Sequence, residues 1–394
     1  MRIALDARWI FDEISGIGAH TVELIRHLAR LDHENSFIIL FSDRKLAERT
    51  WMDCQLTDKP NFRPEVVPWS LFSPRGQLLL PGHLRRQRVD VYHSTNYMIP
   101  LAAFPRDRTG RIRCVATIHD LIPLLFPQAT PNAIKTRLFP VYKRLMLEVG
   151  RRADRIITVS EASRQDVLEH LRIPAERHAS VVVIHNGVSN RFRPPVPPAG
   201  SPPAGSPATV LYVGRSDPYK NLENLMEAFA LARARSPIPL RLRLIGPPDP
   251  RYPGAGERIR KLNLAPYVER VGYQAADNLV RAYQSAAVTI LPSRYEGFGL
   301  PVVESMACGT PVICGDIPVL REVAGEAALF APPDDIPALA DAMTRAVNDA
   351  ALRRTLSERG LAQAARFTWA DNARHTLALY QELGSATPHA EGQP

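Results

Sequence analysis

The chain of 394 residues is too long for one ordinary hydrophobic core and suits two domains of about 190 residues each. With 45% hydrophobic and 23% charged residues it has the composition of a globular protein, and its net charge of +9 is compatible with nucleic acid, an anionic membrane or phosphorylated ligands. No nucleic-acid-binding module is recognisable, which argues against the first of these partners. No apolar run approaches the roughly 20 residues of a membrane-spanning helix and no signal peptide is seen, so we expect a cytoplasmic protein.

The four cysteines are Cys54, Cys114, Cys308 and Cys314. They lie far apart or in apolar surroundings, and none forms a C-x-x-C pair. The pattern therefore predicts reduced core cysteines, with neither a disulfide framework nor a zinc site.

A glycine element separates the first predicted strand from the first predicted helix. Residues 2–6 predict a buried strand and residues 18–31 an amphipathic helix, with Gly16 and Gly18 between them. The element lacks the third glycine and the acidic residue of a dinucleotide fingerprint, so a dehydrogenase is not supported. Taken alone, it fits a tight turn better than a phosphate site.

Polar residues follow several further strands of the first half. A strand is predicted at 37–41, the stretch from there to about residue 75 has no interpretable pattern, and the last strand of this half is predicted at 181–184. Between them, apolar runs end before the polar residues Asn96, Tyr97, His119 and Asp120. Doubly wound sheets place ligands at the carboxyl ends of their strands, so these residues are candidates for substrate contacts. A lone histidine is more often a structural hydrogen-bonding group.

The segment 132–152 interleaves lysine and arginine with apolar residues. It could dock on anionic lipid as a basic amphipathic helix. The alternative is a pair of packed helices with a solvated basic face, which an interruption at Pro140 favours.

The run PPVPPAGSPPAGSP at 194–207 has no apolar residue able to anchor a core and predicts a linker. A new strand at 210–213 then leads to Arg215 and Lys220, just before a helix predicted at 222–234. Two cations at a helix N-terminus are unfavourable for the helix dipole unless an anion lies between them, which favours a diphosphate there. A solvated loop with two basic side chains is the alternative.

The most informative stretch is ILPSRYEGFGLPVVESMACGTP at 290–311, which predicts a strand, a glycine loop and a short helix with Pro301 in its first turn. Its free backbone N–H groups and helix dipole favour an anion. Glu296 in the loop and Glu304, predicted in the first helical turn, instead favour neutral hydroxyls, at about 1.5–3 kcal/mol per hydrogen bond. Together they indicate a sugar nucleotide, although Glu304 could also serve only to complement the dipole.

Several of these motifs resemble one enzyme family. Glu296 and Glu304, eight positions apart around GFGLP and followed by ACGTPVI, resemble the E-x7-E signature of retaining glycosyltransferases of family 4. GRSDPYKN resembles the G-R-x-x-x-x-K-N element of that family, and ATIHD resembles its strand-end histidine. The resemblance implies an α/β protein of GT-B architecture, with two Rossmann-like doubly wound domains facing a central cleft.

The resemblance also implies a domain plan. Residues 1–193 are expected to form an acceptor-binding domain, 194–207 the linker and 208–368 a nucleotide-sugar-binding domain. A final helix at about 369–394 is expected to cross back onto the first domain.

Residue roles follow by the same resemblance. The implied catalytic residues are Glu296, His119, Arg215 and Lys220. The implied donor-binding residues are Gly16, Gly18, Arg215, Lys220, Gly246, Gly272, Glu296, Gly297, Phe298, Gly299, Leu300 and Glu304. The acceptor is expected at Asn96, Tyr97 and Asp120.

The implied reaction is a retaining transfer of a hexose from a nucleotide sugar, with GDP-mannose as the first donor to try and a UDP-sugar as another. The expected acceptor is a polysaccharide or a lipid-linked oligosaccharide. GDP-mannose comes first among the donors because the N-terminal MRIALDARWI and SGIGAHTVELIRHL resemble bacterial polysaccharide mannosyltransferases. The chain contains no D-x-D element, so we expect a metal-independent enzyme without a cofactor. Peripheral contact with the inner face of the membrane stays open. The alternatives are a GT-B disaccharide synthase or sugar phosphorylase with a soluble acceptor, and a non-catalytic nucleotide-sugar-binding protein.

Overall fold

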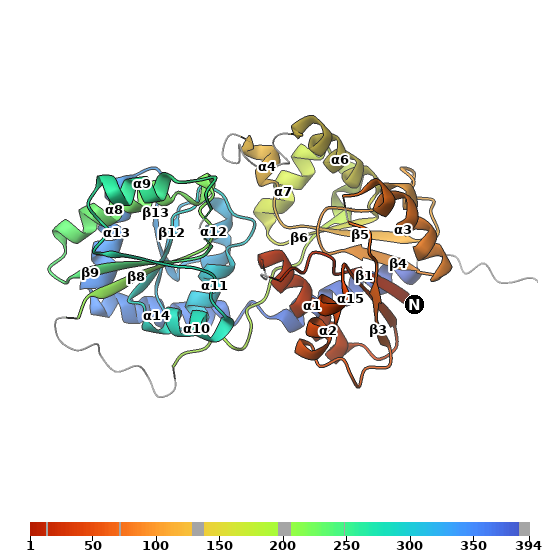
Figure 1. The fold of residues 1–394 in the computed structure, drawn as a ribbon, viewed down its shortest axis with the longest axis horizontal. Helices are drawn as coiled ribbons and strands as arrows, with labels where there is room; N and C mark the ends of the chain where they lie inside the picture. The colour runs from red at the N-terminus through yellow and green to blue at the C-terminus, as the bar shows by residue number, and fades with distance from the viewer. Residues whose placement is uncertain (13–14, 71, 128–137, 196–205, 248, 386–394) are drawn as a thin grey trace, which may run out of the picture. The chain divides into compact units, whose positions relative to one another are not determined.

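The computed structural model describes the chain except for residues 13–14, 71, 128–137, 196–205, 248 and 386–394. The chain divides into two compact units, each with its own sheet (Figure 1). The first unit comprises Met1–Leu121, Pro140–Gly187 and Trp369–Pro394, and the second comprises Ile122–Phe139 and Val188–Thr368. Most of the linker predicted at 194–207 lies outside the described residues.

The first unit contains a seven-stranded parallel sheet in the order β3-β2-β1-β4-β5-β6-β7. Its strands are β1 (Arg2–Asp6), β2 (Ser36–Phe41), β3 (Phe62–Val66), β4 (Val91–Ser94), β5 (Arg113–Ile118), β6 (Arg155–Thr158) and β7 (Val181–Val183). Its α-helices are α1 (Gly16–Leu31), α2 (Arg44–Asp53), α3 (Pro74–Arg86), α6 (Phe139–Arg152), α7 (Glu161–His170) and α15 (Trp369–Ser385).

The interior strands of this sheet are buried almost throughout, because helices cover both faces. In β2 every residue from Phe37 to Phe41 is buried. The last helix completes this core: α15 packs along α1 and contributes Leu379, Tyr380 and Leu383 to the same hydrophobic cluster as Leu24.

The second unit contains a six-stranded parallel sheet in the order β10-β9-β8-β11-β12-β13. Its strands are β8 (Ala208–Val213), β9 (Leu240–Ile245), β10 (Val268–Val271), β11 (Val288–Leu291), β12 (Val312–Gly315) and β13 (Ala328–Ala331). Its α-helices are α4 (Ile122–Leu125), α8 (Leu222–Arg235), α9 (Gly254–Lys261), α10 (Ala276–Ser285), α11 (Leu300–Ala307), α12 (Pro318–Ala324), α13 (Ile336–Asn348) and α14 (Ala350–Ala364).

The direction of winding reverses once in each sheet. In the first sheet the reversal lies between β1 and its neighbour β4, and in the second between β8 and its neighbour β11. The loops that follow the two strands at such a switch point diverge, which leaves a crevice where doubly wound proteins bind ligands. The fold therefore directs attention to the residues just after β1, β4, β8 and β11.

Three local expectations differ from the structure. The stretch after residue 41 without an interpretable pattern holds α2, β3 and the start of α3. Helix α1 begins at Gly16, so Gly16 and Gly18 lie in its first turn, not before it. Pro140 is the second residue of α6, where a proline is tolerated because its missing N–H would have no helical partner, so it does not interrupt the helix. The part of the basic segment at 132–137 lies outside the described residues.

All four cysteines are buried and free of disulfides. None of the helices in the described ranges has the length and hydropathy needed to cross a bilayer.

Candidate functional site

The switch point of the second sheet brings Lys220 and Glu296 into contact. Lys220 ends the short 3-10 turn Pro218–Lys220 after β8, and Glu296 lies in the loop after β11. The Lys220 Nζ donates to both carboxylate oxygens of Glu296, at 2.7 and 2.9 Å, and the Ser293 hydroxyl donates to Glu296 Oε1 at 2.6 Å. The side chains of Lys220 and Glu296 are only 13% and 8% exposed. Three side chains from two loops thus form one largely buried polar cluster.

Arg215 follows β8 directly and is held by acidic neighbours. Its Nε donates to Asp217 at 2.9 Å, and its Nη2 lies 3.6 Å from Asp249. The Tyr212 hydroxyl donates to the Arg215 carbonyl at 2.7 Å. The guanidinium remains half exposed, so it can still reach a ligand.

These contacts correct the argument drawn from the helix dipole. Arg215 and Lys220 already pair with Asp217 and Glu296, so their charges at this end of α8 do not by themselves require an external anion. A diphosphate would have to compete with these carboxylates for the two cations.

Asn221 joins the two loops. It has a left-handed backbone, with φ of 63°, and its side-chain amide donates to the carbonyl of Pro292 at 3.1 Å and to that of Pro333 at 2.6 Å. The backbone N–H of Arg294 donates to the Tyr219 carbonyl at 2.8 Å. The position of Lys220 relative to Glu296 is therefore fixed by main-chain contacts as well as by their ion pair.

Two glycines permit close approach of backbone at this edge of the sheet. A Cβ on Gly246 would lie 2.0 Å from the Gly214 carbonyl oxygen. Gly299 precedes α11 with φ of 96°, and a Cβ there would lie 2.7 Å from Leu320. No other residue type fits either position without a shift of the backbone or its neighbour.

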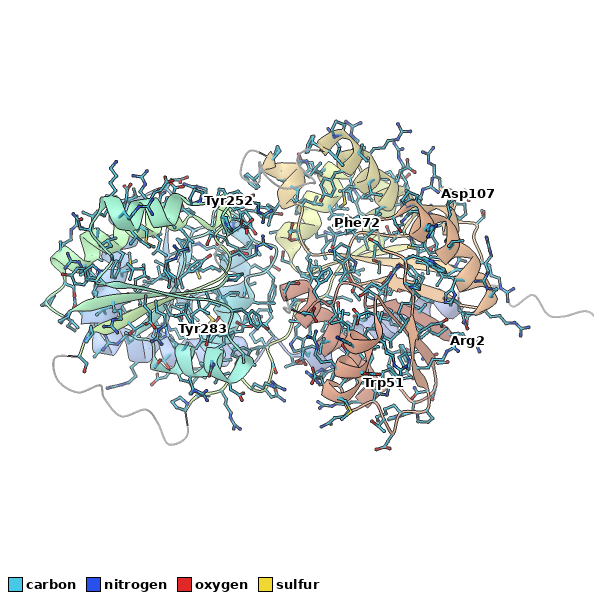
Figure 2. The ribbon with its side chains drawn as sticks, viewed as in Figure 1. Arg2, Trp51, Phe72, Asp107, Tyr252 and Tyr283 are labelled. Carbon is cyan, nitrogen blue, oxygen red and sulfur yellow. The ribbon has the colours of Figure 1, made fainter. Side chains whose placement is uncertain are left out.

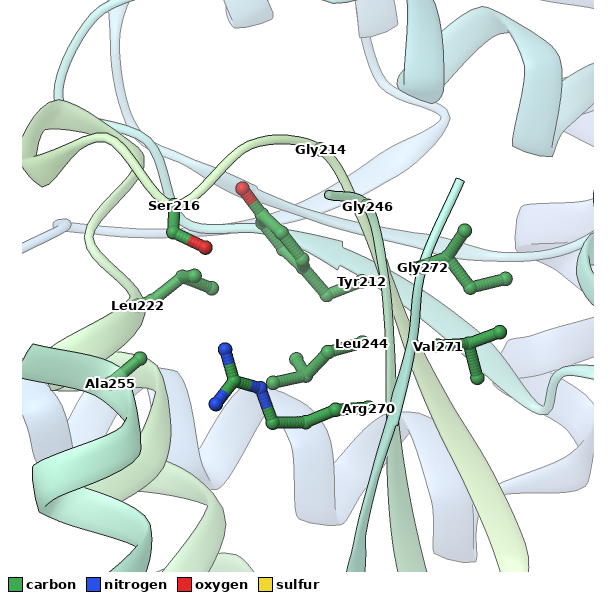
Figure 3. Close-up of a pocket in the computed structure, with 11 residues that line it drawn as sticks. Tyr212, Gly214, Ser216, Leu222, Leu244, Gly246, Ala255, Arg270, Val271 and Gly272 are labelled. Atoms are coloured by element: carbon green, nitrogen blue, oxygen red, sulfur yellow. The ribbon is translucent and has the colours of Figure 1, made fainter. Parts of the chain in front are cut away.

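A cavity of about 320 Å³ opens beside Gly246 and Gly272 (Figure 3). Its lining comes from the carboxyl ends of β8, β9 and β10 and from the starts of α8 and α9. The side chains that line it include Tyr212, Ser216, Leu222 and Arg270. A mostly apolar hollow with few polar groups is typical of a site for a small molecule.

Glu304 lies in the second turn of α11, one turn later than predicted. Its Oε2 accepts a hydrogen bond from the buried Tyr283 hydroxyl at 2.9 Å (Figure 2 labels Tyr283). Burial raises the pKa of the Glu304 carboxyl to about 7, although the bond from Tyr283 opposes this rise.

The loop before α11 offers backbone more than side chains. The Phe298 side chain is 3% exposed and packs edge-to-face on Phe367, with ring centroids 5.5 Å apart. Its main chain is therefore the part able to contact a ligand. Gly297 and Leu300 are partly exposed on either side of it.

In the first unit, His119 follows β5 and lies near the buried His20 of α1. Its Nε2–H donates to the Thr95 carbonyl at 3.0 Å, which leaves Nδ1 as an acceptor. The two imidazole rings are edge-to-face, with centroids 4.8 Å apart, and the Nδ1–H of His20 donates to Asn186 at 2.8 Å. Burial lowers the pKa of His119 to about 4 and that of His20 to about 3, so both rings are neutral near pH 7.

The predicted acceptor residues differ in exposure. Asn96 and Tyr97, just after β4, are 4% and 3% exposed, and Asn96 Oδ1 accepts from the Tyr97 backbone N–H at 2.8 Å. Asp120 is partly exposed. Gly18 is buried in the first turn of α1, where its N–H donates to the Ser15 hydroxyl at 3.3 Å, and Gly16 is exposed.

Sequence reasoning missed several residues of these clusters, among them Ser293, Asp217 and His20. Ser293 and Asp217 lie within the quoted stretches at 290–311 and 214–221, so their place in these motifs was a usable signal. His20 carried no signal, since an apolar helix face around a histidine usually means a structural residue. In the described part of the chain, no group of three or more His, Cys, Asp or Glu side chains is placed to hold a metal ion.

Comparison with known sequences and structures defines the class of protein. Residues 14–191 match the family Glycosyltransferase Family 4, and residues 198–363 match Glycosyl transferases group 1. The chain belongs to the family 4 glycosyltransferases of GT-B architecture, so the predicted family and fold class are confirmed and the protein is a glycosyltransferase enzyme.

Several curated proteins resemble it along its length. It is 28% identical to the O-antigen chain mannosyltransferase B of Escherichia coli, over 97% of this chain and 100% of that protein. It is 26% identical to the MMP alpha-(1->4)-mannosyltransferase of Mycolicibacterium hassiacum, over 97% and 98% of the two chains. The serotype-specific mannosyltransferase WbdA of Escherichia coli is 30% identical over 74% of this chain, which spans 36% of that longer protein.

Solved structures share the fold. Sucrose-phosphate synthase from Thermosynechococcus elongatus superposes with a TM-score of 0.75 at 22% identity, covering 98% of this chain and 99% of that one. HepE from Anabaena, in complex with UDP-glucose, gives a TM-score of 0.72 at 18% identity, with 97% and 100% covered.

Proposed function

We propose that the protein transfers mannose from GDP-mannose to a growing polysaccharide or lipid-linked oligosaccharide, with retention of the anomeric configuration. The observation that carries this proposal is the Lys220, Glu296 and Ser293 cluster at the switch point of the second sheet. It brings an ammonium group, which suits a phosphate, next to a carboxylate, which suits sugar hydroxyls, and this supports the proposal. The mannosyltransferase names of the relatives with full-length similarity support mannose as the sugar.

In this proposal the second unit binds the donor. Arg215 and Lys220 hold the diphosphate and stabilise the charge that appears on it as the glycosyl bond opens. Glu296 accepts from hydroxyls of the transferred sugar, and Glu304 accepts from the ribose. The backbone of Gly297, Phe298, Gly299 and Leu300 approaches the sugar phosphate at the start of α11, and the cavity beside Gly246 and Gly272 receives the base.

The first unit binds the acceptor. The bond from the sugar C1 to the phosphate oxygen breaks, the acceptor oxygen forms the new bond on the same face, and the leaving phosphate takes the acceptor proton. His119, a neutral imidazole with Nδ1 as acceptor, orients a hydroxyl of the transferred sugar and does not donate a proton. Gly16 and Gly18 leave room for the diphosphate, while Asn96, Tyr97 and Asp120 shape the acceptor site. The same plan assigns residues 1–193 to the acceptor, 208–368 to the donor and 369–394 to the first domain.

The role of Lys220 in this cluster is tested with Lys220→Ala. We expect the donor KM to rise and kcat to fall, by on the order of a hundredfold in kcat/KM, because a charge-assisted bond to the leaving group strengthens in the transition state. Lys261→Ala, which removes an exposed lysine of the same unit, is the control and should leave both constants unchanged. Unchanged kinetics in Lys220→Ala would remove this residue from the site.

The identity of the donor is tested by binding. Binding of GDP-mannose, UDP-glucose and ADP-glucose by thermal shift identifies the base, and the UDP-sugar complex of a structural neighbour makes UDP the competing choice.

Because the chain has no D-x-D element, we expect full activity in EDTA. Loss of activity in EDTA with recovery on adding manganese or magnesium would contradict metal independence.

We further propose peripheral contact with an anionic membrane surface through α6. Leu138, just before this helix, and Val141 are 55% and 65% exposed, and the neighbouring Lys143 and Arg144 are exposed as well. Exposed apolar residues beside cations fit a lipid interface. Vesicles that contain anionic lipid should bind the wild-type protein. They should bind it less at high salt, and they should bind Val141→Asp less than the wild type. Equal binding to neutral vesicles would argue against this surface.

Product analysis with inorganic phosphate and soluble sugars tests the phosphorylase and disaccharide synthase alternatives.

A further inference from the structure

An aromatic cluster lies beyond the strands that flank the switch point of the first sheet. Trp9 follows β1, Tyr97 follows β4 and Phe72 precedes α3. The Trp9 ring is edge-to-face with Phe72, with centroids 5.6 Å apart, and its centroid lies 5.7 Å from that of Tyr97. We call Trp9, Phe72 and Tyr97 the aromatic wall.

A buried ion pair holds the residue next to Trp9 in place. The Arg8 guanidinium donates to both oxygens of Asp6, at 2.8 and 2.6 Å, and to the Trp69 carbonyl at 2.9 Å. Tyr92 donates to the same carboxylate at 2.6 Å, and Asp6 and Arg8 are 0% and 3% exposed. The residue before Trp9 is thereby tied to the segment that carries Phe72. Such support by buried neighbours is what a preorganised binding surface needs.

The wall combines an exposed ring with an unsatisfied donor. Phe72, labelled in Figure 2, is an aromatic residue whose side chain is 55% exposed. Trp9 is 7% exposed, and its indole N–H is buried without a hydrogen-bond acceptor among the described residues. Buried tryptophan N–H groups normally have a partner, and here water or a ligand would have to supply it.

These features fit a pyranose better than a flat lipid surface. A hexopyranose has C–H groups that pack on aromatic rings and hydroxyl oxygens at its edge that accept hydrogen bonds. The wall lies beyond the strands of the switch point, where doubly wound proteins bind small ligands. A membrane surface or a protein helix would also cover Phe72, but mannotriose would then leave the Trp9 resonance unmoved.

We propose that the aromatic wall binds a hexopyranose unit of the acceptor saccharide, with the sugar face against Phe72 and Trp9 and a sugar oxygen accepting from the Trp9 indole N–H. The inference rests on the proposed function, which assigns the acceptor to the first unit, and it adds two residues that set which acceptor is used. The wall acts in binding and takes no part in the transfer of the sugar.

Binding is tested directly on Trp9. The chain has four tryptophans, so its indole N–H resonances are few in a spectrum of the ¹⁵N-labelled protein, and the Trp9 resonance is the one missing in Trp9→Phe. Addition of α-linked mannotriose should shift this resonance in a saturable way. Phe72→Ala should weaken the apparent affinity about tenfold, the size expected for the loss of one aromatic contact.

Kinetics separate the wall from the donor site. Phe72→Ala and Trp9→Phe should each raise the acceptor KM about tenfold, while the donor KM and the hydrolysis of donor without acceptor stay unchanged. Met52→Ala removes a similarly exposed apolar side chain from α2 and is the control. Phe72 is exposed, so its variant is expected to fold even if Trp9→Phe does not.

Two failures are distinguishable. The proposal for the aromatic wall is wrong if mannotriose leaves the Trp9 resonance unmoved while donor binding and hydrolysis persist. It is equally wrong if the acceptor KM of Phe72→Ala stays within about twofold of the wild-type value. A wild-type protein that neither binds nor hydrolyses any nucleotide sugar overturns the proposed function instead.

Discussion

Glu304 shows how one carboxyl can couple donor binding to pH. With its pKa raised to about 7, it is mostly protonated at pH 6 and mostly ionised at pH 8, and only the ionised form accepts freely from two ribose hydroxyls. We expect the donor KM to rise by on the order of tenfold from pH 8 to pH 6, with little change in kcat. Glu304→Gln should raise the KM at pH 8 and abolish this dependence. A donor KM that is flat with pH in the wild type would contradict the assignment.

The raised pKa of Glu304 also predicts that the folded protein is less stable at high pH, where donor binding is expected to be tighter. The folded pKa of Glu304 lies above its ordinary value of 4.5, so the folded state binds the proton more tightly and stability falls as pH rises from about 4.5 through about 7. Glu304→Gln removes this buried charge. Its Tm should therefore exceed that of the wild type at pH 8 and match it near pH 4.5, as measured by thermal unfolding at both values.

The Lys220 and Glu296 pair should contribute to stability when no ligand is bound. Lys220→Ala leaves the Glu296 carboxylate buried with Ser293 as its remaining side-chain partner among the described residues, and breaking a buried pair in this way costs about 3 kcal/mol. The exposed pair of Arg44 and Glu48 is the matched control, since Arg44→Ala should cost less than about 0.5 kcal/mol. Equal losses in urea unfolding of the two variants would show that Lys220 is not held as described.

At this scale the sequence predicts the residue types of the site but not their partners. The spacing of Glu296 and Glu304 and the position of Lys220, together with the family resemblance, selected them as candidates. Nothing in one sequence shows that Glu296 reaches Lys220, 76 positions away, because that contact depends on β8 and β11 being neighbours. The dipole argument for a diphosphate was incomplete for this reason, since it left out the carboxylates that the fold supplies.

Among the elements, α15 has the clearest structural role. Its Tyr380 is fully buried, with its hydroxyl 2.5 Å from His93 Nδ1, and its ring packs in the core of the first sheet. Tyr380→Phe should cost about 1 kcal/mol for the lost hydrogen bond, and Tyr380→Ala about 3–5 kcal/mol for the cavity. Urea unfolding measures both. A loss below 1 kcal/mol in Tyr380→Ala would mean that α15 contributes little to this core.

The predicted elements follow the strength of their patterns. The apolar runs of β1, β2, β5, β8 and β11 identified those strands correctly because parallel strands are buried on both faces. Strand β3 was missed because its sequence FRPEV carries a proline and charges, which an edge strand tolerates. Helix α3 was missed because glycines and the internal Pro81 mask its period, although Ser73 caps its start.

On the scale of the whole molecule, the two units should respond separately to ligand and to mutation. Each has its own sheet and core, and Tyr380 and Lys220 belong to different units. A ligand that binds only the folded donor unit stabilises that unit by about 2.7 kcal/mol at a hundredfold excess over Kd. In calorimetry we therefore expect two transitions, with GDP raising one and Tyr380→Ala lowering the other. The control is Lys220→Ala, in which GDP at the same concentration should raise its transition less. If GDP and Tyr380→Ala move the same transition in opposite directions, the units unfold together and the separation is wrong.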